Sequence, residues 1–475
     1  MEYLNQIKEN ISKYKEDMVK SLVELVQINS VADTPKADMP FGEGVTKALE
    51  YMLNKGEADE FAVANIDNYG GHIDLLPGDS WDGQVMGILA HLDVVPAGSD
   101  WDYDPFGGEI DDNKIYGRGT MDDKGPALAA YYAMKAIKEA KVPLSRKVRL
   151  VLGLDEETGS KGMEYYLAKT VKPDFGFTPD ADFPVVHGEK NILIFELAKK
   201  LMKPSGKGIE LRSFKGGNAP NMVPDFARAV VRADNPMVYE QLKEKAARAR
   251  EEGKQIKTKG MGKSLEITAH GISAHGSEPQ DGVNAISMLM EFFKDIEFIN
   301  ESVNDFIEFY NSHIGYELNG ESLGIDFEDE ISGGTVVNVG MIDLDTKRAS
   351  MSVNVRFPIS FDDETIYDGM SQNVGKYNIG VIKERYQEGI FVDPEDTLVA
   401  TLMDVYKKAT GDEEAESKVI GGGTYARTME NFVAFGPLFP GQEDRIHQKN
   451  EYMDIDLFVK MTEIYAEAIF ELCKA

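Results

Sequence analysis

Residues 87–96 read GILAHLDVVP, an apolar run that finishes on His91-Leu92-Asp93. The run predicts a buried strand. A buried charged group is costly unless it is paired or bound to a metal, so the strand's end needs partners from elsewhere in the chain. Taken alone, however, a His-x-Asp pair is more often a satisfied core pair than a ligand site.

Strands and helices alternate on both sides of this stretch. Amphipathic helices are predicted over residues 8–28 and 44–56, the second ending at Gly56. Two more strands, in KVRLVLGLDEETGS and PDFGFTPDADFP, also finish on acidic residues, and PALAAYYAMKAIKEA predicts a helix with Pro126 in its first turn. The alternation predicts an α/β fold with a mostly parallel sheet.

The pattern changes after His187. Strands such as TVVNVGMIDL follow, with helical stretches near residues 236–253 and 283–311. Strand–helix–strand order occurs twice, around 226–270 and 348–390, which indicates an inserted α+β domain with two similar halves.

The α/β character returns near residue 388 and includes the glycine-rich turn IGGGTYAR. We therefore expect a discontinuous catalytic domain of residues 1–187 and 388–475, interrupted by an inserted lid domain of residues 188–387. A chain of 475 residues is also too long for one compact core.

Composition limits the function classes. The formal net charge is −31, which argues against nucleic acid and against anionic membranes as partners. No run approaches the roughly 20 apolar residues of a membrane span, and we expect a cytoplasmic protein. The one cysteine, Cys473, allows no disulfide framework and no thiolate metal site, and we expect it in a frayed C-terminal segment.

Acidic residues and one histidine follow several of the predicted strands. His91 ends one strand, Glu156 and Glu157 follow another, and Asp180 follows a third. In open α/β sheets, ligands bind outside the carboxyl ends of the strands. Carboxylates gathered there would repel one another unless cations were present. One imidazole with oxygen ligands and no sulfur fits zinc, manganese or cobalt.

A glycine-rich loop, GRGTMDDKG, presents Asp122 and Asp123 before a helix, and the residues alone do not decide which of the two binds metal. Asp93 shares a strand face with His91 and can take its ring N–H. Of the adjacent glutamates, we assign Glu157 to metal and Glu156 to the general base, although such a pair alone is more often a solvated loop.

The later histidines include three candidates. His447, in RIHQKNEYM, lies in a polar loop and is a plausible late metal ligand. His275, in GISAHGSEPQDGVNAI, lies between small residues in the predicted lid, and His270 competes with it for a catalytic role. The Gly-x-Ser-x-Gly motif of serine hydrolases and the His-Glu-x-x-His motif of zincins are both absent from the sequence.

Read together, HLDVVPAG, IYGRGTMDDKGP, DEETGS, PDADFP, GISAHGSEPQDGVNAI and IHQKNEYM resemble the dinuclear-metal aminoacylase, carboxypeptidase and dipeptidase family. More narrowly, the chain is similar to the PepV-type dipeptidases of Gram-positive bacteria. The resemblance covers essentially the whole chain. Each motif alone is weak, but the set in this order is highly specific.

The resemblance implies two divalent metal ions per chain, Zn or Mn. It implies that Asp122 bridges the two metals, that Glu156 is the base, that Asp93 orients His91 and that His275 stabilises the oxyanion. The implied metal ligands are His91, Asp122, Glu157, Asp180 and His447. The implied substrate-binding residues are Asn221, Arg356, Gly422, Gly423 and Thr424.

These roles imply a metal-dependent dipeptidase in which a hydroxide between the metals attacks the peptide bond of a small peptide with a free amino terminus. The large lid further implies a monomer. Two alternatives remain at this point: an N-acyl amino-acid deacylase or desuccinylase, and a peptide-binding relative that has lost its metals.

Overall fold

The computed structural model describes residues 2–78, 80–203 and 206–475. Contacts divide the chain into two compact units. Unit 1 contains Met1–Gly188, Phe391–Lys418 and Gly423–Ala475, and unit 2 contains Glu189–Ile390 and Val419–Gly422. A division by contacts does not show which parts of a chain fold or act as separate domains. The domain boundaries expected from the sequence therefore stay a prediction.

Unit 1 is built on a sheet that is nine-stranded over the described residues. Its four central strands, β6, β3, β7 and β22, run parallel, and β1 and β2 join antiparallel at one side. The spatial order is β1 (Ala62–Asn65), β2 (Gly70–Leu75), β6 (Lys147–Gly153), β3 (Val85–His91), β7 (Phe175–Thr178), β22 (Phe432–Ala434), β9 (Val186–Glu189) and β20 (Ile390–Phe391), with β21 (Lys418–Ile420) beside β9.

Helices cover both faces of this sheet. Tyr166 of α4 reaches His72 on one face of β2, whereas Gly56 of α2 packs against Ile73 on the other face. Every residue of β3 is buried, as expected for a parallel strand covered on both sides. The helices of unit 1 are α1 (Glu2–Val26), α2 (Glu43–Ala58), α3 (Lys124–Glu139), α4 (Lys161–Lys169), α9 (Thr397–Thr410) and α10 (Ile455–Cys473), with the short 3₁₀ segments η1 (Glu156–Thr158) and η3 (Tyr425–Thr428).

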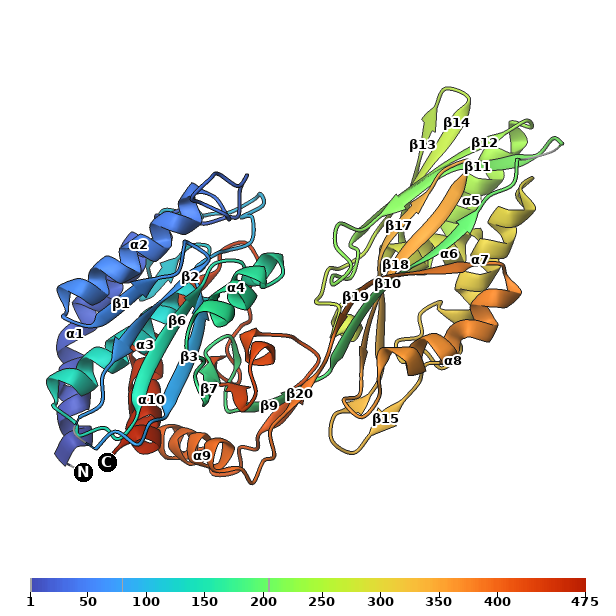
Figure 1. Cartoon of the computed structure of the whole chain (residues 1–475). Helices are drawn as coiled ribbons and strands as arrows, with labels where there is room; N and C mark the ends of the chain where they lie inside the picture. The colour runs from blue at the N-terminus through green and yellow to red at the C-terminus, as the bar shows by residue number, and fades with distance from the viewer. Residues whose placement is uncertain (1, 79, 204–205) are drawn as a thin grey trace. The chain divides into compact units, whose positions relative to one another are not determined.

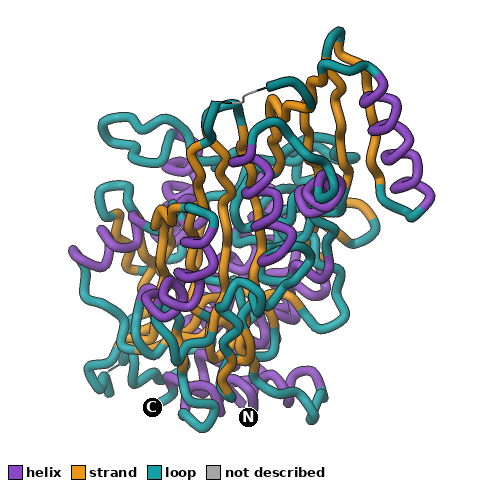
Figure 2. The backbone as a smooth tube through the Cα atoms, turned by 90° about the vertical axis from the view of Figure 1, so that its right-hand side faces the viewer, coloured by secondary structure: helices purple, strands orange, loops and turns teal. Residues whose placement is uncertain are grey.

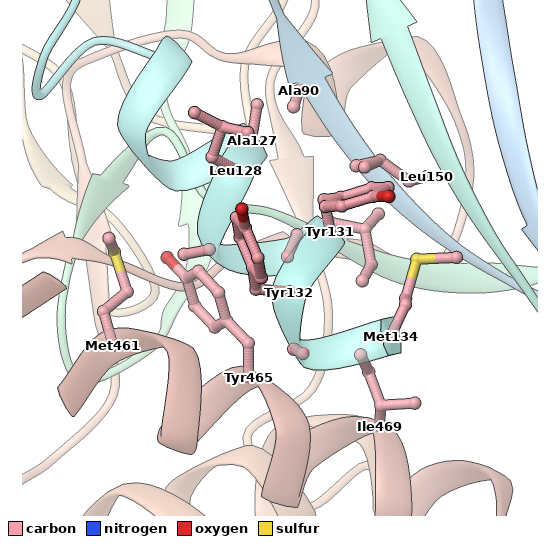
Figure 3. Packing of buried hydrophobic residues seen from close by; sticks show 14 of the residues in the cluster. Ala90, Ala127, Leu128, Tyr131, Tyr132, Met134, Leu150, Met461, Tyr465 and Ile469 are labelled. Carbon is pink, nitrogen blue, oxygen red and sulfur yellow. The ribbon is translucent and has the colours of Figure 1, made fainter. Parts of the chain in front are cut away.

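The core of unit 1 lies where α3 and α10 pack against the sheet. Figure 3 shows Tyr131 and Tyr132 of α3 in this core, with Leu150 of β6 and Tyr465 of α10 among the buried residues around them. Both α3 tyrosines are fully buried, and each large side chain removed from water in this way stabilises the fold by about 1.5–3 kcal/mol. A small sheet of β4 (Glu109–Asp111), β5 (Lys114–Tyr116) and β24 (Tyr452–Asp454) precedes α3 and α10.

Unit 2 is an antiparallel sheet, eight-stranded over the described residues, with helices on one face (Figure 1). Figure 2 distinguishes its strands and helices along the chain by colour. The strand order is β13 (Gln255–Met261), β14 (Ser264–His270), β12 (Phe226–Ala233), β11 (Ile209–Gly216), β17 (Val336–Leu344), β18 (Arg348–Phe357), β10 (Asn191–Lys200) and β19 (Gly380–Gln387). The helices are α5 (Met237–Glu251), α6 (Ala285–Phe293), α7 (Glu301–His313) and α8 (Asp363–Lys376).

The order contains two similar halves. In one half, the hairpin β11–β12 leads through α5 to β13, and β14 fills the place between β12 and β13. In the other half, the hairpin β17–β18 leads through α8 to β19, and β10 fills the corresponding place. The two halves meet where β11 pairs with β17. The predicted fold class is therefore confirmed: an α/β part with a mostly parallel sheet is interrupted by an α+β part with two similar halves.

Three local expectations were wrong. The helix expected to end at Gly56 continues to Ala58, because Gly56 serves close packing against Val63 and Ile73. The stretch 283–311 is two helices, since Asn300 caps α7 and starts it anew. Cys473 is not frayed: it is buried in the last turn of α10, with its Sγ 3.4 Å from Sδ of Met86.

Within the described residues, none of the helices combines the length and the apolar character that a membrane crossing requires.

Candidate metal centre

The residues that follow three neighbouring parallel strands lie close together, at the carboxyl ends of those strands in the unit 1 sheet. His91 is the last residue of β3, and it pairs in register with Gly153, the last residue of β6. Glu156 and Glu157 follow β6 in η1, and Asp180 lies just after β7. The carboxyl ends of parallel strands lie at the same edge, so these side chains converge there.

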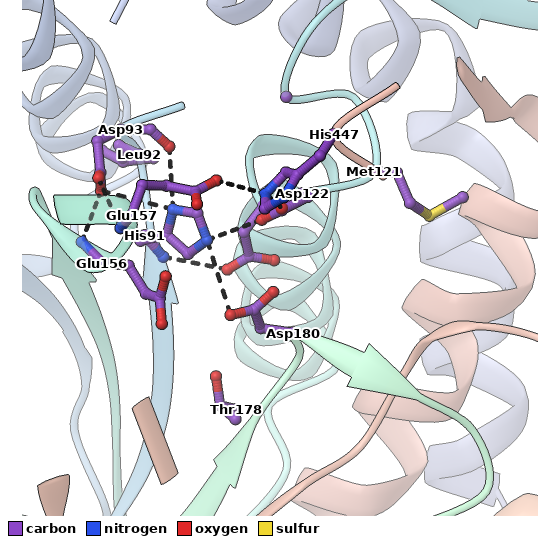
Figure 4. A network of polar contacts seen from close by, with 12 residues as sticks. His91, Leu92, Asp93, Met121, Asp122, Glu156, Glu157, Thr178, Asp180 and His447 are labelled. Atoms are coloured by element: carbon purple, nitrogen blue, oxygen red, sulfur yellow. Dashed lines mark hydrogen bonds and ion pairs between the residues drawn. The ribbon is translucent and has the colours of Figure 1, made fainter. Parts of the chain in front are cut away.

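Two further side chains reach the same point from loops. Asp122 lies between β5 and α3, and His447 lies shortly before β24. Nε2 of His91 is 2.8 Å from Oδ1 of Asp122, and Nε2 of His447 is 2.8 Å from Oδ2 of the same carboxylate. Nε2 of His447 is also 2.9 Å from Oε1 of Glu157. Asp122 therefore lies between two imidazoles (Figure 4).

The donor atoms fit divalent cations. Ligand atoms of His91, Asp122 and Glu157 lie within 4.8 Å of one another, and so do those of His91, Glu156 and Asp180. Nε2 of His91 and Oδ1 of Asp122 are buried and, among the described residues, form no hydrogen bond even though they lie 2.8 Å apart. A buried imidazole nitrogen and a buried carboxylate oxygen, with further carboxylate oxygens nearby and no sulfur, suit divalent cations such as zinc or manganese.

The charges of the cluster conflict as they stand. Burial raises the pKa of Glu156 to about 8, and the carboxylates of Glu157 and Asp122 add to this effect. Burial and the charge of Asp122 also raise the pKa of Asp180 well above its ordinary value. Burial alone would lower the pKa of His91, but its contacts with Asp122 and Asp93 outweigh burial and raise it. Cations in the centre would remove this conflict among like charges.

Asp93 connects two parts of the cluster. Its backbone carbonyl lies 3.0 Å from Nδ1 of His91, and its Oδ1 lies 3.5 Å from the same nitrogen. Its two carboxylate oxygens accept the backbone N–H groups of Glu156, at 3.2 Å, and Glu157, at 3.1 Å. Asp93 thereby fixes the ring of His91 and the turn that carries both glutamates.

The structure separates Asp122 from Asp123, which the residues alone did not. Asp123 is fully buried, and its Oδ2 accepts the backbone N–H of His91 at 3.0 Å. Its carboxylate therefore supports the end of β3, whereas that of Asp122 faces both imidazoles.

Four of the residues expected to contact substrate, His275, Asn221, Arg356 and Gly422, lie within unit 2. Nδ1 of His275 lies 2.5 Å from Oγ of Ser277, and the backbone carbonyl of Asn221 accepts the N–H of Gly276. Nη1 of Arg356 donates to the carbonyl of Gly421 at 2.7 Å. A side chain on Gly421 would meet both Ser277 and Arg356. These segments, together with Gly422, therefore lie side by side in one unit.

The other expected residues lie elsewhere. Gly423 and Thr424 belong to unit 1, where the Thr424 hydroxyl oxygen caps η3 by accepting the N–H of Ala426 at 3.1 Å. His270 lies on β14 against the ring of Phe226, at a centroid distance of 5.2 Å. The choice of His275 over His270 stays a prediction.

Two buried residues of this region were missed. Glu451 accepts hydrogen bonds from the loop that carries Asp122, and Tyr425 packs edge-to-face against His91 at 6.2 Å. Both lie inside recognised motifs, IHQKNEYM and IGGGTYAR. No spacing in the sequence shows their partners, which are 300 or more positions away along the chain.

Comparison with known proteins identifies the class. The model of peptidase family M20/M25/M40 matches residues 87–471. The chain belongs to this family of peptidases.

Two similar proteins are known by name. The "Putative dipeptidase" of Staphylococcus epidermidis (strain ATCC 12228 / FDA PCI 1200) is 37% identical over 473 residues, which cover 98% of this chain and 99% of that protein. The "Putative dipeptidase YtjP" of Bacillus subtilis (strain 168) is 37% identical over 470 residues, with the same shares covered.

Solved structures share the fold. Human carnosine dipeptidase 1 superposes with a TM-score of 0.60 at 16% identity, over 99% of this chain and 98% of that chain. The dipeptidase Dug1p from Saccharomyces cerevisiae superposes with a TM-score of 0.58 at 14% identity, over the same shares. At these identities the likeness concerns the fold.

Proposed function

We propose that the protein is a metal-dependent dipeptidase that hydrolyses the peptide bond of dipeptides with a free amino terminus. The observation that carries the proposal is the position of Asp122, whose two carboxylate oxygens each lie 2.8 Å from a different imidazole, those of His91 and His447. A carboxylate placed in this way suits a bridge between two cations. The names of two similar proteins, both putative dipeptidases, agree with this activity.

We assign His91, Asp122 and Asp180 to one cation, and Asp122, Glu157 and His447 to a second. The cations, zinc or manganese, would polarise the scissile carbonyl and lower the pKa of a water molecule to roughly 7. The carboxylate of Glu156 would take the proton of that water and pass it to the leaving amine. Asp93 keeps the ring of His91 and the turn of both glutamates in place.

Residues of unit 2 and the glycine-rich turn are assigned to the substrate. The Arg356 guanidinium suits a two-pronged clamp on the C-terminal carboxylate of a dipeptide. His275 donates a hydrogen bond to the oxyanion of the transition state, and Asn221 holds the substrate beside it. Backbone groups of Gly422, Gly423 and Thr424 contact the same carboxylate. The support for these roles is the family's motif pattern and the adjacency of His275, Asn221, Gly421 and Arg356 within unit 2.

We further propose a cytoplasmic monomer that binds neither nucleic acid nor membranes. The formal net charge of −31 supports both exclusions, since nucleic acids and anionic lipid surfaces require basic patches. The doubled sheet of unit 2 supports the monomer, because one chain supplies two copies of the same strand and helix pattern.

The decisive experiment compares substrate classes. The protein is stripped of metal with a chelator, supplied with zinc or manganese, and incubated with dipeptides, the same dipeptides acetylated at the amino terminus, and N-succinyl and N-acetyl amino acids. We expect metal-dependent hydrolysis of the free dipeptides and little of the others. Faster cleavage of the acyl amino acids would establish a deacylase instead. Binding of dipeptides without any turnover would establish a peptide-binding protein.

A further inference from the structure

The loop that presents Asp122 is held by a single carboxylate that belongs to a distant part of the chain. Oε1 of Glu451 accepts the backbone N–H groups of Gly119, at 3.0 Å, Met121, at 2.9 Å, and Asp122, at 3.3 Å. Its own backbone carbonyl accepts the N–H of Gly117 at 2.9 Å. Four amides of one short loop therefore converge on Glu451.

The second carboxylate oxygen of Glu451 also accepts a hydrogen bond. Oε2 accepts Nη1 of Arg118 at 2.6 Å, and both side chains are buried, at 0% exposure for Glu451 and 2% for Arg118. A buried carboxylate is tolerated because this guanidinium and the amides compensate its charge. Both oxygens are occupied by these partners, and Glu451 belongs to neither of the two groups that could hold a cation.

Glu451 also lies close in sequence to a second ligand. His447 is four residues earlier, and β24, which begins at Tyr452, pairs with β5 immediately before the loop. One side chain thus joins the segment that carries His447 to the loop that carries Asp122, although these segments are more than 300 residues apart along the chain.

We propose that Glu451 is a positioning residue that sets the geometry of Asp122 between the two cations. The inference rests on the proposed metal centre and adds a residue to it. Glutamine cannot replace Glu451. An amide oxygen turned towards the three N–H groups places its NH₂ group against Arg118, and the opposite orientation places NH₂ against the backbone N–H groups. Either choice opposes donor to donor.

The test measures cation binding directly. Glu451→Gln and Glu451→Asp are compared with the unsubstituted protein by titration with cobalt(II), following both the dissociation constants and the visible absorption spectrum of the bound ion. The aspartate variant keeps the charge but has one methylene group too few to reach all three amides. We expect cobalt to bind about 10–100-fold more weakly in both variants, with an altered spectrum and a matching fall in kcat.

The matched control is Glu467→Gln. Glu467 is also a buried glutamate, 3% exposed, but it lies on α10 and pairs with Lys8 and Lys408. We expect this variant to lose stability while keeping the cobalt affinity and spectrum. A loss that came from general destabilisation would appear in the control as well.

The outcomes separate the two proposals. Folded Glu451 variants with unchanged cobalt affinity and spectrum would overturn this inference alone. Failure of both variants to fold would overturn it too, since Glu451 would then serve the fold as a whole. Absence of any cobalt uptake by the unsubstituted protein would overturn the proposed function, and this inference with it.

Discussion

The protonation state of single residues in the proposed metal centre depends on charged groups that lie very close to them. Asp122 is buried and lies 2.8 Å from each of two imidazole nitrogens. Burial alone would raise its pKa, but the close contacts with the imidazoles of His447 and His91 lower it. A carboxylate that stays ionised between two nitrogens is prepared to bind cations on both sides, so the chemistry of the centre depends on this residue first.

Glu156→Gln tests the division of labour between the adjacent glutamates. The substitution keeps the shape of the side chain but removes the carboxylate to which we assign the role of general base. We expect kcat for a dipeptide to fall by about 10²–10⁴-fold, while metal analysis still finds the bound cations. The matched control is Glu164→Gln on α4, which we expect to be neutral. Retention of substantial turnover in the Glu156 variant would transfer the role of base to another group.

His72 gives a prediction about pH. Burial, with Arg149 adding to it, lowers its pKa from 6.5 to about 4. The folded chain therefore keeps His72 neutral where the unfolded chain takes up a proton. The stability from the neutral form is complete above pH 6.5 and is lost as the pH falls from 6.5 towards 4. The loss is about 2 kcal/mol by pH 5.

The measurement is urea unfolding of the chelated protein at pH 7.5 and pH 5. For each protein, the unfolding free energy at pH 5 is subtracted from that at pH 7.5. We expect this difference to be about 2 kcal/mol smaller for His72→Gln than for the unsubstituted protein. Gln retains a hydrogen-bonding group for the hydroxyl of Tyr166, which lies 2.8 Å from Nδ1 of His72. Equal pH dependence in both proteins would show that His72 does not contribute.

At the scale of elements, the sequence predicts those parts of the centre that follow from strand ends. The apolar run ending at His91 and those before Glu156 and Asp180 have the length and character of buried parallel strands, so their convergence follows from sheet geometry. The contacts of Glu451 and Asp123 cannot be predicted in this way. They are hydrogen bonds to backbone groups of distant segments, and periodicity records only which face of an element is buried.

The same limit explains the errors in the helices. The helical spacing of apolar residues over 283–311 continues across the non-helical segment between α6 and α7. Apolar residues of that segment, such as Phe298, are buried as well. The position of Cys473, two residues from the last residue of the sequence, predicts a frayed end. In the structure, the apolar face of α10 stays packed through Cys473 itself. Tertiary burial decides where an amphipathic helix ends.

Packing between elements predicts an effect of Gly153→Ala. Gly153 ends β6, and a Cβ there would lie 2.2 Å from Oη of Tyr425 and 2.3 Å from a carbon of its ring. Tyr425 is fully buried in η3 and packs against His91, so it cannot move without disturbing a proposed metal ligand. We expect the unfolding free energy to fall by about 1–3 kcal/mol and cobalt binding to weaken.

Gly78→Ala is the matched control for this packing effect. Gly78 also lies in unit 1, and a Cβ at Gly78 would meet nothing within 4 Å. We expect its unfolding free energy to stay within about 0.5 kcal/mol of the unsubstituted protein. Similar values for the two alanine variants would mean that η3 moves aside without cost. The argument that Tyr425 supports His91 would then be wrong.

The whole molecule combines a unit that carries the proposed metal centre with an inserted unit whose sheet, over the described residues, ends at the strands β13 and β19. An exposed edge strand offers unpaired backbone groups to another chain, and proteins prevent such pairing with lysines on the edge. β13 ends the strand order of unit 2, and along it the buried Ile256 alternates with the exposed Lys257 and Lys259. The placement of these charges agrees with a chain that stays monomeric.

Replacing the two edge lysines tests the monomer. We expect Lys257→Val with Lys259→Val to associate at tens of micromolar, seen as a concentration-dependent mass in light scattering, because valine favours strand pairing and removes the repulsion between two edges. The control replaces Lys200 of β10 and Lys215 of β11, whose strands have partners on both sides. It alters charge equally but offers no free edge, so it should stay monomeric. If the control variant also associates, the effect comes from the lost charge and not from the edge strand. If the unsubstituted protein is itself a dimer, the lysines do not protect this edge.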